Sequence, residues 1–513
     1  MTSGAPHPGG VTKLPSYISG LDLITNGGLP KGRTTLVAGT AGAGKTVFAT
    51  QFLVEGIRRD GDGAVFVTFE ERPDDIRANM RSFGWDIDEY EADGRWGFVD
   101  VSPNRETDGT VVGEFDFEPL LLRIRHCIER TGATRVVIDS IGAIFTRFTD
   151  APRVRSELFR VFDSLRDLGV TALMTAERAN EYGEVSRFGV EEFVADNVIL
   201  LRNVLDDERR RRTIEILKFR GTAHQKGQFP MTIVESGVHV VPLSAIELKQ
   251  HSTDLRISSG IAELDEMCGG GLFRDSVVLA SGATGCGKTL LVSHFIAAAA
   301  AHGEKTVLFA FEESREQLFR NAAGWGIDFE QFERDGLLVV RCAYPETAGL
   351  EDHLLRITET IADIAPDRVA VDSLSALERI STERSFREFV LGLTSHIKHR
   401  DMAGLFTSTT AELFGGTSIT EAHISTITDS IILLRYVEQL GTVERAVTVL
   451  KMRGSAHDTR IRRFYIDDDG MHIAEPFRTV AGILAGTPQQ LSYVGAPGGG
   501  DGDGNGDGNG QHG

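Results

Sequence analysis

An internal repeat limits what this chain can fold into more than any other feature of its sequence. The segment GTAGAGKT at 39–46 returns as GATGCGKT at 282–289, an offset of 243 residues. Self-similarity in a fixed order is the mark of a duplicated structural unit. Three more segments recur in that order: FEE at 69–71 and 311–313, IDS at 138–140 and VDS at 371–373, and KFRGTAH at 218–224 and KMRGSAH at 451–457.

The repeat predicts two homologous domains joined by a short linker. A chain of 513 residues is long enough for two large cores. A terminal segment rich in Gly and Asp has too little apolar surface to fold. We therefore expect a flexible extension at 1–13, a first domain at 14–242, a linker at 243–260, a second domain at 255–487 and a disordered tail at 488–513.

Each half is predicted to be an α/β domain with a mainly parallel sheet. Short β-branched runs at 33–39 and 276–282 lead into the glycine-rich segments, and a helical pattern follows each of them. Buried strands are expected at 64–70 and 135–140, and again at 306–312 and 368–373. Strands that alternate with helices predict a parallel sheet, whose ligand lies at the carboxyl ends of the strands.

Composition excludes several other classes of protein. The formal net charge of −20 disfavours a broad nucleic-acid surface, because phosphate backbones are repelled by acidic surfaces. The longest clean apolar run, at 295–301, is far too short to span a membrane. The N-terminus lacks a signal-peptide pattern, and the cysteines Cys127, Cys268, Cys286 and Cys342 form no CxxC pair. We therefore expect a reducing, cytoplasmic location without a disulfide framework or a zinc site.

Both halves contain the GxxxxGK[ST] pattern of a phosphate-binding loop between a strand and a helix. Lys45 and Lys288 are expected to reach the β- and γ-phosphates of ATP, and Thr46 and Thr289 to offer hydroxyls to Mg²⁺. Glycines let backbone N–H groups wrap the phosphates at the start of a helix. The other expected contacts are Gly42, Ala43, Gly44, Thr284, Gly285, Cys286, Gly287 and Leu290.

Carboxylates follow two further strands of each half. Asp139 and Asp372 end apolar strands at the Walker B position, where an acid can support Mg²⁺, although a lone Asp there is more often a helix cap. Adjacent acids near bound phosphates are unfavourable unless they orient water, take a proton or hold a metal. The candidate catalytic residues are Glu70, Glu71, Glu312 and Glu313, with Glu312 also a candidate metal ligand.

The KxRGxxH segment near the end of each half is a third candidate element. Lys and Arg two residues apart on a strand point to the same face, so both charges can address one phosphate group. In ring-shaped ATPases such cations often come from the neighbouring subunit. A basic edge strand with no ligand is the alternative interpretation.

Together these features resemble the KaiC family, the double-domain RecA-like ATPases of the circadian clock. The resemblance spans about 14–488 and includes RSFGWD, VEEFVADNVILLRNVLDDERRRRTIEILK, SSGIAELDEMCGGG, CAYPETAGLEDHL and EAHISTITDSIILLRYVE. It implies a hexamer of two stacked rings with ATP between neighbouring subunits. The first domain would be a slow ATPase and the second a serine/threonine autokinase and autophosphatase.

The resemblance also assigns roles to individual residues. Purine contacts would be Ser82 in the first half and Trp325 in the second. Phosphorylation would occur at Ser425 and Thr426, which align at offset 233 with Glu192 and Phe193, so the first half has no hydroxyl there. The neighbour's nucleotide contacts would be Lys218, Phe219, Arg220, Thr222, His224, Arg445, Lys451, Met452, Arg453, Ser455, His457 and Thr459.

One departure from the family bears on its partners. The sequence after 488 lacks the C-terminal loop and long charged helix of members that use the activator KaiA, which argues against KaiA binding. A KaiB-like partner on the first ring is left open by the sequence.

Two other functions are carried as alternatives. A RecA-type DNA recombinase or helicase would need a basic loop, and the clearest basic run is 209–212, which we interpret as a solvated turn after three acids. Salt-dependent DNA binding would distinguish it. A hexameric scaffold that binds ATP without turnover is the other alternative, and the repeated glutamate pairs argue against it.

Overall fold

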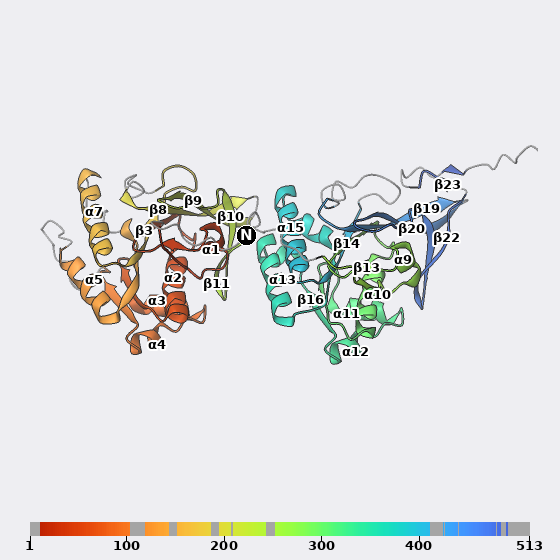
Figure 1. Ribbon diagram of the computed structural model, residues 1–513, viewed down its shortest axis with the longest axis horizontal. Helices are drawn as coiled ribbons and strands as arrows, with labels where there is room; N and C mark the ends of the chain where they lie inside the picture. Colours follow the sequence, from red (N-terminus) through yellow and green to blue (C-terminus); the bar gives the residue numbers. More distant parts are fainter. Residues whose placement is uncertain are drawn as a thin grey trace, which may run out of the picture. The chain divides into compact units, whose positions relative to one another are not determined.

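The computed structural model describes residues 11–102, 118–142, 151–185, 194–206, 209–242, 252–410, 424, 426–439, 441–478, 480–483 and 489–490. The chain divides into two compact units, Met1–Leu248 with Ala348–Arg356 and Lys249–Thr347 with Ile357–Gly513. Each unit has its own sheet and helices (Figure 1). Each also has its own buried core. The exact limits of the two domains stay predictions.

The first unit begins with a small two-stranded sheet and continues as alternating strands and helices. Its strands are β1 (Lys13–Leu14), β2 (Leu29–Pro30), β3 (Thr34–Gly39), β4 (Gly63–Thr68), β5 (Trp96–Asp100), β6 (Ala133–Asp139), β7 (Thr171–Glu177), β8 (Asn197–Asp206), β9 (Arg209–Phe219), β10 (Gln228–Val234) and β11 (Gly237–Val240). Its helices are α1 (Leu21–Ile24), α2 (Lys45–Asp60), α3 (Pro73–Arg81), α4 (Ile87–Ala92), α5 (Glu118–Thr131) and α7 (Ala151–Asp167).

Among the described residues, the main sheet of this unit has nine strands in the order β11-β10-β9-β8-β3-β7-β6-β4-β5. The six strands from β8 to β5 are parallel, and β9 to β11 continue the sheet as antiparallel hairpins. The strand β3, which precedes the first glycine-rich loop, is therefore central. The expected α/β class with a mainly parallel sheet is confirmed.

Alternating residues along the strands supply the two faces of this sheet. Val37 of β3 packs with α1, α2, α3 and α4, while its neighbours Leu36 and Ala38 pack with α5 and α7 on the opposite face. Because successive strand residues point to opposite faces, an apolar run such as that of β3 is buried on both sides.

The second unit repeats this plan. Its strands are β12 (Arg256–Ile257), β13 (Leu272–Phe273), β14 (Val277–Gly282), β15 (Thr306–Ala310), β16 (Leu338–Cys342), β17 (Arg368–Asp372), β18 (Ala403–Thr409), β19 (Ser430–Gln439), β20 (Thr442–Met452), β21 (Arg462–Asp467), β22 (Gly470–Pro476), β23 (Val480–Ala481) and β24 (Gln489–Gln490). Its helices are α9 (Ala262–Met267), α10 (Lys288–Ala301), α11 (Arg315–Ala323), α12 (Phe329–Arg334), the short 3₁₀ turn η2 (Pro345–Thr347), α14 (Leu374–Glu378) and α15 (Glu383–His399). The helix α13 (Leu350–Ile364) is divided between the units, and its residues from Ile357 onward belong to the second.

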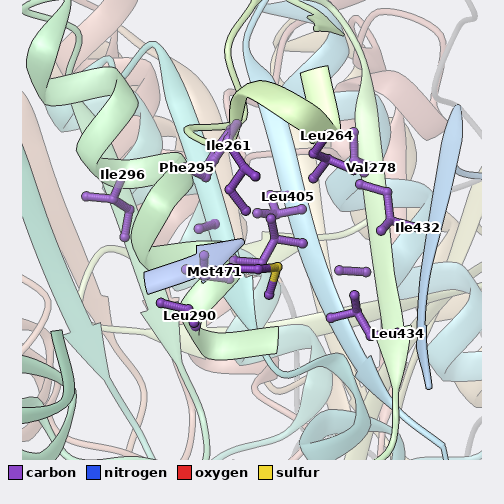
Figure 2. Packing of buried hydrophobic residues seen from close by; sticks show 14 of the residues in the cluster. Ile261, Leu264, Val278, Leu290, Phe295, Ile296, Leu405, Ile432, Leu434 and Met471 are labelled. Carbon is purple, nitrogen blue, oxygen red and sulfur yellow. The ribbon is translucent and has the colours of Figure 1, made fainter. Parts of the chain in front are cut away.

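The second main sheet has the order β16-β15-β17-β18-β14-β19-β20-β21-β22, also nine strands within the described part of the chain. Its core includes Leu290 and Phe295 of α10, which lie with Val278 of β14 and Met471 of β22 (Figure 2). The helix α10 is buried along most of its length, which fixes the glycine-rich loop before it against the sheet.

Three local expectations need correction. Lys13 lies in β1 rather than in a flexible extension, because its backbone pairs with Pro30. Gln489 and Gln490 of the expected disordered tail form β24 and pair with β23. The basic run 209–212 is the start of β9, not a turn, since it pairs with β8 along its length.

Residues 1–10 of the expected extension, residues 488 and 491–513 of the expected tail and the linker residues 243–251 lie outside the described residues. None of the helices in the described part of the chain has the length and apolar character that a membrane crossing requires.

Candidate nucleotide-binding sites

The first phosphate loop leaves the carboxyl end of β3 and enters α2. Gly42 and Gly44 have φ of 75° and 93°, a region that residues with a Cβ rarely adopt. Nζ of Lys45 donates to the carbonyl oxygens of Gly39 and Thr40, both at 3.0 Å. Burial lowers the pKa of Lys45, and nearby carboxylates, Glu177 first, partly oppose that shift. The loop thus holds a lysine beside its own backbone at a helix N-terminus, the arrangement that binds phosphates.

A threonine and an aspartate from different elements meet below this loop. Oγ1 of Thr46, the second residue of α2, donates to Oδ2 of Asp139 at 2.7 Å. Asp139 ends β6, and its other oxygen accepts from the hydroxyl of Thr175 on β7. Two hydroxyls therefore hold the carboxylate at the carboxyl edge of the sheet, where the sequence places the metal-supporting acid.

Glu70 and Glu71 follow β4 by two and three residues, at the same edge. Oε1 of Glu70 accepts from the hydroxyl of Ser140 at 2.6 Å, and Oε2 of Glu71 accepts from the side-chain amide of Asn79 at 3.4 Å. Burial raises the pKa of Glu71, and the charge of Asp139 adds to the rise. The pair is brought to the phosphate loop as the sequence predicts.

The second half builds the same site with small changes. Nζ of Lys288 donates to the carbonyls of Gly282 and Ala283, both at 2.9 Å. Oγ1 of Thr289 donates to Oδ2 of Asp372 at 2.8 Å, and the other carboxylate oxygen accepts from Thr407. Burial raises the pKa of Asp372, and its two hydroxyl partners oppose that shift.

The second glutamate pair has different partners from the first. Oε1 of Glu312 pairs with the guanidinium of Arg379 at 3.0 Å, whereas Glu70 accepts from a serine hydroxyl. Ser373, the residue equivalent to Ser140, has a buried Oγ that makes no hydrogen bond within the described part of the chain. Glu313 keeps the amide contact, from Asn321 at 2.9 Å, and burial raises its pKa with a further contribution from Asp372.

A cleft of about 470 Å³ adjoins the first phosphate loop. Ser82, the expected purine contact, lines it. Trp325, the expected contact of the second half, is half-buried against the core and aligns at offset 242 with Phe83, which also lines the first cleft. The complete lining is Thr46, Val47, Glu71, Ala78, Asn79, Met80, Ser82 and Phe83.

Sequence reasoning missed a pair of residues on the hairpin beside each loop. Asn203 of β8 and Arg212 of β9 are opposite each other, and both donate to the carbonyl of Gly42, at 3.4 and 3.3 Å. The equivalent pair is Tyr436 and Arg445. The repeat offset of 233 could have found Arg212, because it aligns with Arg445, which the resemblance assigned to nucleotide binding.

The second pair approaches its loop in a similar way. The hydroxyl of Tyr436 donates to the carbonyl of Thr284 at 3.4 Å, and the Arg445 guanidinium lies 5.7 Å from the Tyr436 ring. Nε of Arg445 is buried and makes no hydrogen bond within the described ranges. Arg445 therefore lies beside the loop of its own chain, although the resemblance groups it with contacts to a neighbour's nucleotide.

The KxRGxxH segments lie at the opposite end of each sheet, where the parallel strands begin. Lys218 is on β9, but Arg220 follows the strand, so the expected pair on one strand is corrected to one residue on the strand and one beyond it. Nζ of Lys218 donates to the carbonyl of Ala195, and the backbone N–H of Arg220 donates to the carbonyl of Asp196. The next residue, Asn197, pairs with Thr35 at the start of β3, whereas the loop follows Gly39. Lys451 and Arg453 have the same placement on β20 and beyond it.

The other residues of these segments differ in what they expose. The half-buried ring of His224 lies 5.9 Å from that of Phe219, and Ser455 accepts from Arg256 at 2.6 Å. The side chains of Phe219, Leu290 and Met452 are buried, so only their backbones could contact a nucleotide. The buried side chains of Ala43 and Cys286 limit those residues in the same way. Partly exposed Thr222 and His457 and exposed Thr459 complete the set.

The structure describes only one of the two expected phosphorylation sites. Thr426 is described and exposed, while Ser425 lies outside the described residues, as do the aligned Glu192 and Phe193. The guanidinium of Arg453 donates to the carbonyl oxygen of Thr426 at 2.8 Å. Thr426 therefore lies close to the KxRGxxH segment of its own chain.

The residues at both loops fit a nucleotide bound with Mg²⁺. The lysine ammonium groups already donate to loop carbonyls, so they can turn to phosphate oxygens with little movement. Thr46 with Asp139, and Thr289 with Asp372 and Glu312, supply oxygen ligands, which Mg²⁺ prefers.

The sheet order, the central strand that ends in a phosphate loop and the acids on adjacent strands define a class of protein. They are the features of a P-loop nucleotide-binding domain of RecA-like fold, and here the domain occurs twice in tandem.

Comparison with known proteins gives the family. The model of the KaiC ATPase family matches residues 14–245 and 257–477. The circadian clock protein KaiC3 of Synechocystis is 62% identical over 93% of this chain and 95% of its own length. The circadian clock oscillator proteins KaiC of Thermostichus vulcanus and Synechococcus elongatus are 54% and 52% identical, each over 94% of this chain and 93% of their own. This chain belongs to the KaiC family of circadian clock ATPases.

Proposed function

We propose that the first domain hydrolyses ATP slowly and that the second transfers phosphate from ATP to Ser425 and Thr426 and later removes it. The observation that carries this proposal is the repeated set of loop lysine, threonine–aspartate pair and two glutamates. It gives each half the groups that phosphoryl transfer needs. The protein would serve as a timing or signalling component, as the names of its relatives suggest.

In the first domain, Lys45 would bind the β- and γ-phosphates while the helix N-terminus and loop amides orient them. Glu70 and Glu71 would orient the attacking water and accept its proton. When bound, Mg²⁺ would neutralise charge on the phosphates, and Thr46 with Asp139 would hold it.

In the second domain, the attacking group would be a threonine or serine hydroxyl instead of water. Glu312 would take the proton from that hydroxyl, with Glu313 in support. The oxygen of the side chain would form a bond to the γ-phosphorus as the bond to the β-phosphate oxygen breaks, which leaves ADP. Thr289, Asp372 and Glu312 would hold Mg²⁺ there.

Transfer between chains follows from the position of the acceptor. Asp429, three residues after Thr426, accepts from the backbone N–H of Val277 at the start of β14, whereas the phosphate loop follows Gly282. A strand rises about 3.3 Å per residue, so the two edges are separated by about 16 Å. A hydroxyl near the starting edge would meet the γ-phosphate of a neighbouring chain, which supports a homohexamer with ATP between subunits.

The decisive experiment is incubation with Mg·ATP followed by phosphosite mass spectrometry. We expect phosphate at Ser425 and Thr426 in the parent and none in a variant carrying Ser425→Ala and Thr426→Ala. Undiminished label on that double variant, at other residues, would contradict the site assignment.

Titrations would test the partners. DNA binding that weakens steeply with salt would favour the recombinase or helicase alternative. Titration with a KaiB-like protein would test the partner that the sequence leaves open on the first domain, and titration with KaiA would test the partner that the sequence after 488 argues against.

A further inference from the structure

A buried carboxylate precedes β8 in the first half and β19 in the second. Asp196 and Asp429 have side chains that are only 10% and 12% exposed. They align at the repeat offset of 233 and occupy the starting edge of each sheet. A buried charge is unfavourable unless it is paired, so the partners of each carboxylate indicate its role.

One partner of each carboxylate is a cation from a helix on the same unit. Oδ2 of Asp196 pairs with Arg166 of α7 at 2.9 Å, and Oδ1 of Asp429 pairs with Lys398 of α15 at 2.9 Å. Oδ2 of Asp429 also accepts from the backbone N–H of Val277 at 2.9 Å. These contacts fix the carboxylate between a helix and the sheet.

The other partner is the arginine of the KxRGxxH segment. The backbone N–H of Arg220 donates to the carbonyl of Asp196 at 3.3 Å, and its guanidinium lies 3.9 Å from the carboxylate. Arg453 makes the same two contacts with Asp429, at 3.0 and 4.0 Å. Both arginine side chains remain 53% exposed, so a guanidinium with five N–H donors keeps a face toward solvent.

The lysine of each segment is held by the residue before the aspartate. Nζ of Lys218 donates to the carbonyl of Ala195 at 2.8 Å, and Nζ of Lys451 donates to that of Thr428 at 2.6 Å. One short turn therefore contacts both cations in each half. In the second half, Arg453 in addition holds the carbonyl of Thr426.

We propose that Asp196 and Asp429 are positioning residues, each of which aims the arginine of its KxRGxxH segment at the phosphates of a nucleotide held by a neighbouring chain. In the second half the same contact also places the acceptor Thr426. This inference rests on the proposed function, because it assigns the cations to the neighbour's nucleotide.

The test replaces each aspartate by its neutral isostere. Removal of a residue that orients a metal ligand typically lowers metal affinity or activity by about 10- to 100-fold. For a comparable orienting role here, we expect the reaction rate to fall by about 10-fold. Asp429→Asn should slow Thr426 phosphorylation by about that factor and leave first-domain ATP hydrolysis unchanged. Asp196→Asn should do the reverse, so each half is the matched control for the other.

A double-mutant cycle separates positioning from a general loss of structure. If Asp429 acts through Arg453, a variant with Asp429→Asn and Arg453→Ala should be no slower than Arg453→Ala alone. Losses that multiply in the double variant would overturn the proposal. Asp429→Glu, which keeps the charge, should retain more Thr426 phosphorylation than Asp429→Asn, and equal losses would also overturn it.

Failure of this inference differs from failure of the proposed function. If Arg453→Ala and Arg220→Ala leave phosphorylation and hydrolysis unchanged, the proposed role of the cations is wrong. If those variants lose activity while both Asn variants keep it, only the positioning role is wrong. Should Asp429→Asn fail to fold by circular dichroism, the cycle with Asp196→Asn and Arg220→Ala decides, measured by ATP hydrolysis.

Discussion

Glu70 and Glu312 occupy equivalent places beside their loops, and their partners give them different surroundings. A neutral serine hydroxyl holds Glu70, while a cationic guanidinium holds Glu312. A hydrogen bond to a charged group is stronger than one between a carboxylate and a neutral hydroxyl, so Arg379 fixes the orientation of Glu312 through a charged contact that Glu70 lacks. The two halves therefore differ chemically at the residue that would accept a proton.

The glutamate pair of the first half gives the first prediction. Replacing Glu70 and Glu71 together by Gln keeps their size but removes their charge, so ATP hydrolysis by the first domain should fall by about 10²- to 10⁴-fold. Nucleotide binding, measured with a fluorescent ATP analogue, should persist. Glu129→Gln on the exposed surface of α5 is the control, and unchanged hydrolysis in the double variant would exclude the catalytic role.

The serine contact gives a second prediction at this scale. Ser140→Ala removes the hydroxyl that donates a hydrogen bond to Glu70. The carboxylate then loses its orientation, and first-domain ATP hydrolysis should decrease. Ser373→Ala removes a hydroxyl without a hydrogen bond in the described residues and should leave Thr426 phosphorylation near the parent rate. Steady-state phosphate release and phosphosite analysis of both variants check this, and equal effects would contradict it.

Loop lysines, strand-end acids and glutamate pairs could be predicted from sequence because each depends on local spacing and recurs in both halves. Asn203 could not be, since its contact with Gly42 depends on the register of a hairpin beside β3. Arg212 could have been found only through its alignment with Arg445 at the repeat offset. The partner of Glu312 was missed for a related reason. Arg379 lies 67 residues further on, and only the parallel pairing of β15 and β17 brings the two together.

At the scale of the element, the phosphate loops owe their shape to glycines at positive φ. A Cβ on Gly44 would lie 2.4 Å from Cδ1 of Ile233, whereas a Cβ on Gly84, also at positive φ, would meet nothing within 4 Å. At Gly44, glycine is favoured by the positive φ and by the close approach of Ile233. At Gly84, it is favoured by the positive φ alone.

These two glycines form a matched pair for the third prediction. Gly84→Ala should cost only the strain of the left-handed region, about 1–2 kcal/mol of unfolding free energy. Gly44→Ala adds an overlap that the end of the Ile233 side chain must move to relieve. Because its strained backbone is part of the phosphate loop, this variant should also weaken ATP binding, which Gly84→Ala should not. Urea unfolding and nucleotide titration of both variants measure this, and equal ATP affinity in the two would contradict the prediction.

The helix α15 gives a prediction on pH. Burial lowers the pKa of His396 from 6.5 to about 4, and Nε2 is buried without a hydrogen bond in the described part of the chain. A histidine with a lowered pKa is protonated more readily in the unfolded chain. Its stabilising contribution is therefore complete above pH 6.5 and is lost as the pH falls toward 4.

The measurement compares the parent with His396→Gln, which stays neutral. Between pH 7 and pH 5 the parent should lose more of its unfolding free energy than the variant, because titration of the other groups is common to both. An equal loss in the two proteins, measured by urea unfolding, would show that His396 does not titrate as its surroundings indicate.

The order of strands and helices could be predicted, since apolar runs and glycine-rich loops alternate clearly along the chain. The strand that begins at Arg209 could not, because four consecutive arginines after three acids look like a solvated turn. Their place in β9 is decided by pairing with residues 203–206 of β8, a contact that the composition of the run does not indicate.

At the scale of the whole molecule, the candidate site residues of each half lie at two opposite ends of a sheet. The phosphate loop is at the carboxyl edge, and the KxRGxxH cations are near the starting edge. One chain cannot bring these two ends of its sheet together, so the proposed role of the KxRGxxH cations requires a second chain. On that proposal, nucleotide should stabilise the assembly by mass action.

Assembly gives the last prediction. With saturating Mg·ATP the parent should form a hexamer, and Lys288→Ala should weaken both ATP binding and assembly, because Lys288 would hold the phosphates that bridge two chains. Light scattering with and without nucleotide measures this, with Lys305→Ala, at an exposed-loop position before β15, as a control. A parent protein that stays monomeric with ATP would contradict the proposal of a site shared between two chains.

The central position of β3 and β14 has a consequence for motion. Each strand is bonded on both sides, β3 to β7 and β8, and β14 to β18 and β19. A strand with two partners cannot shift without breaking both ladders, so its amide hydrogens should be among the last to exchange with deuterium. In any conformational change of the protein, these strands and the phosphate loops that follow them would then stay fixed, while side chains and the outer hairpins move.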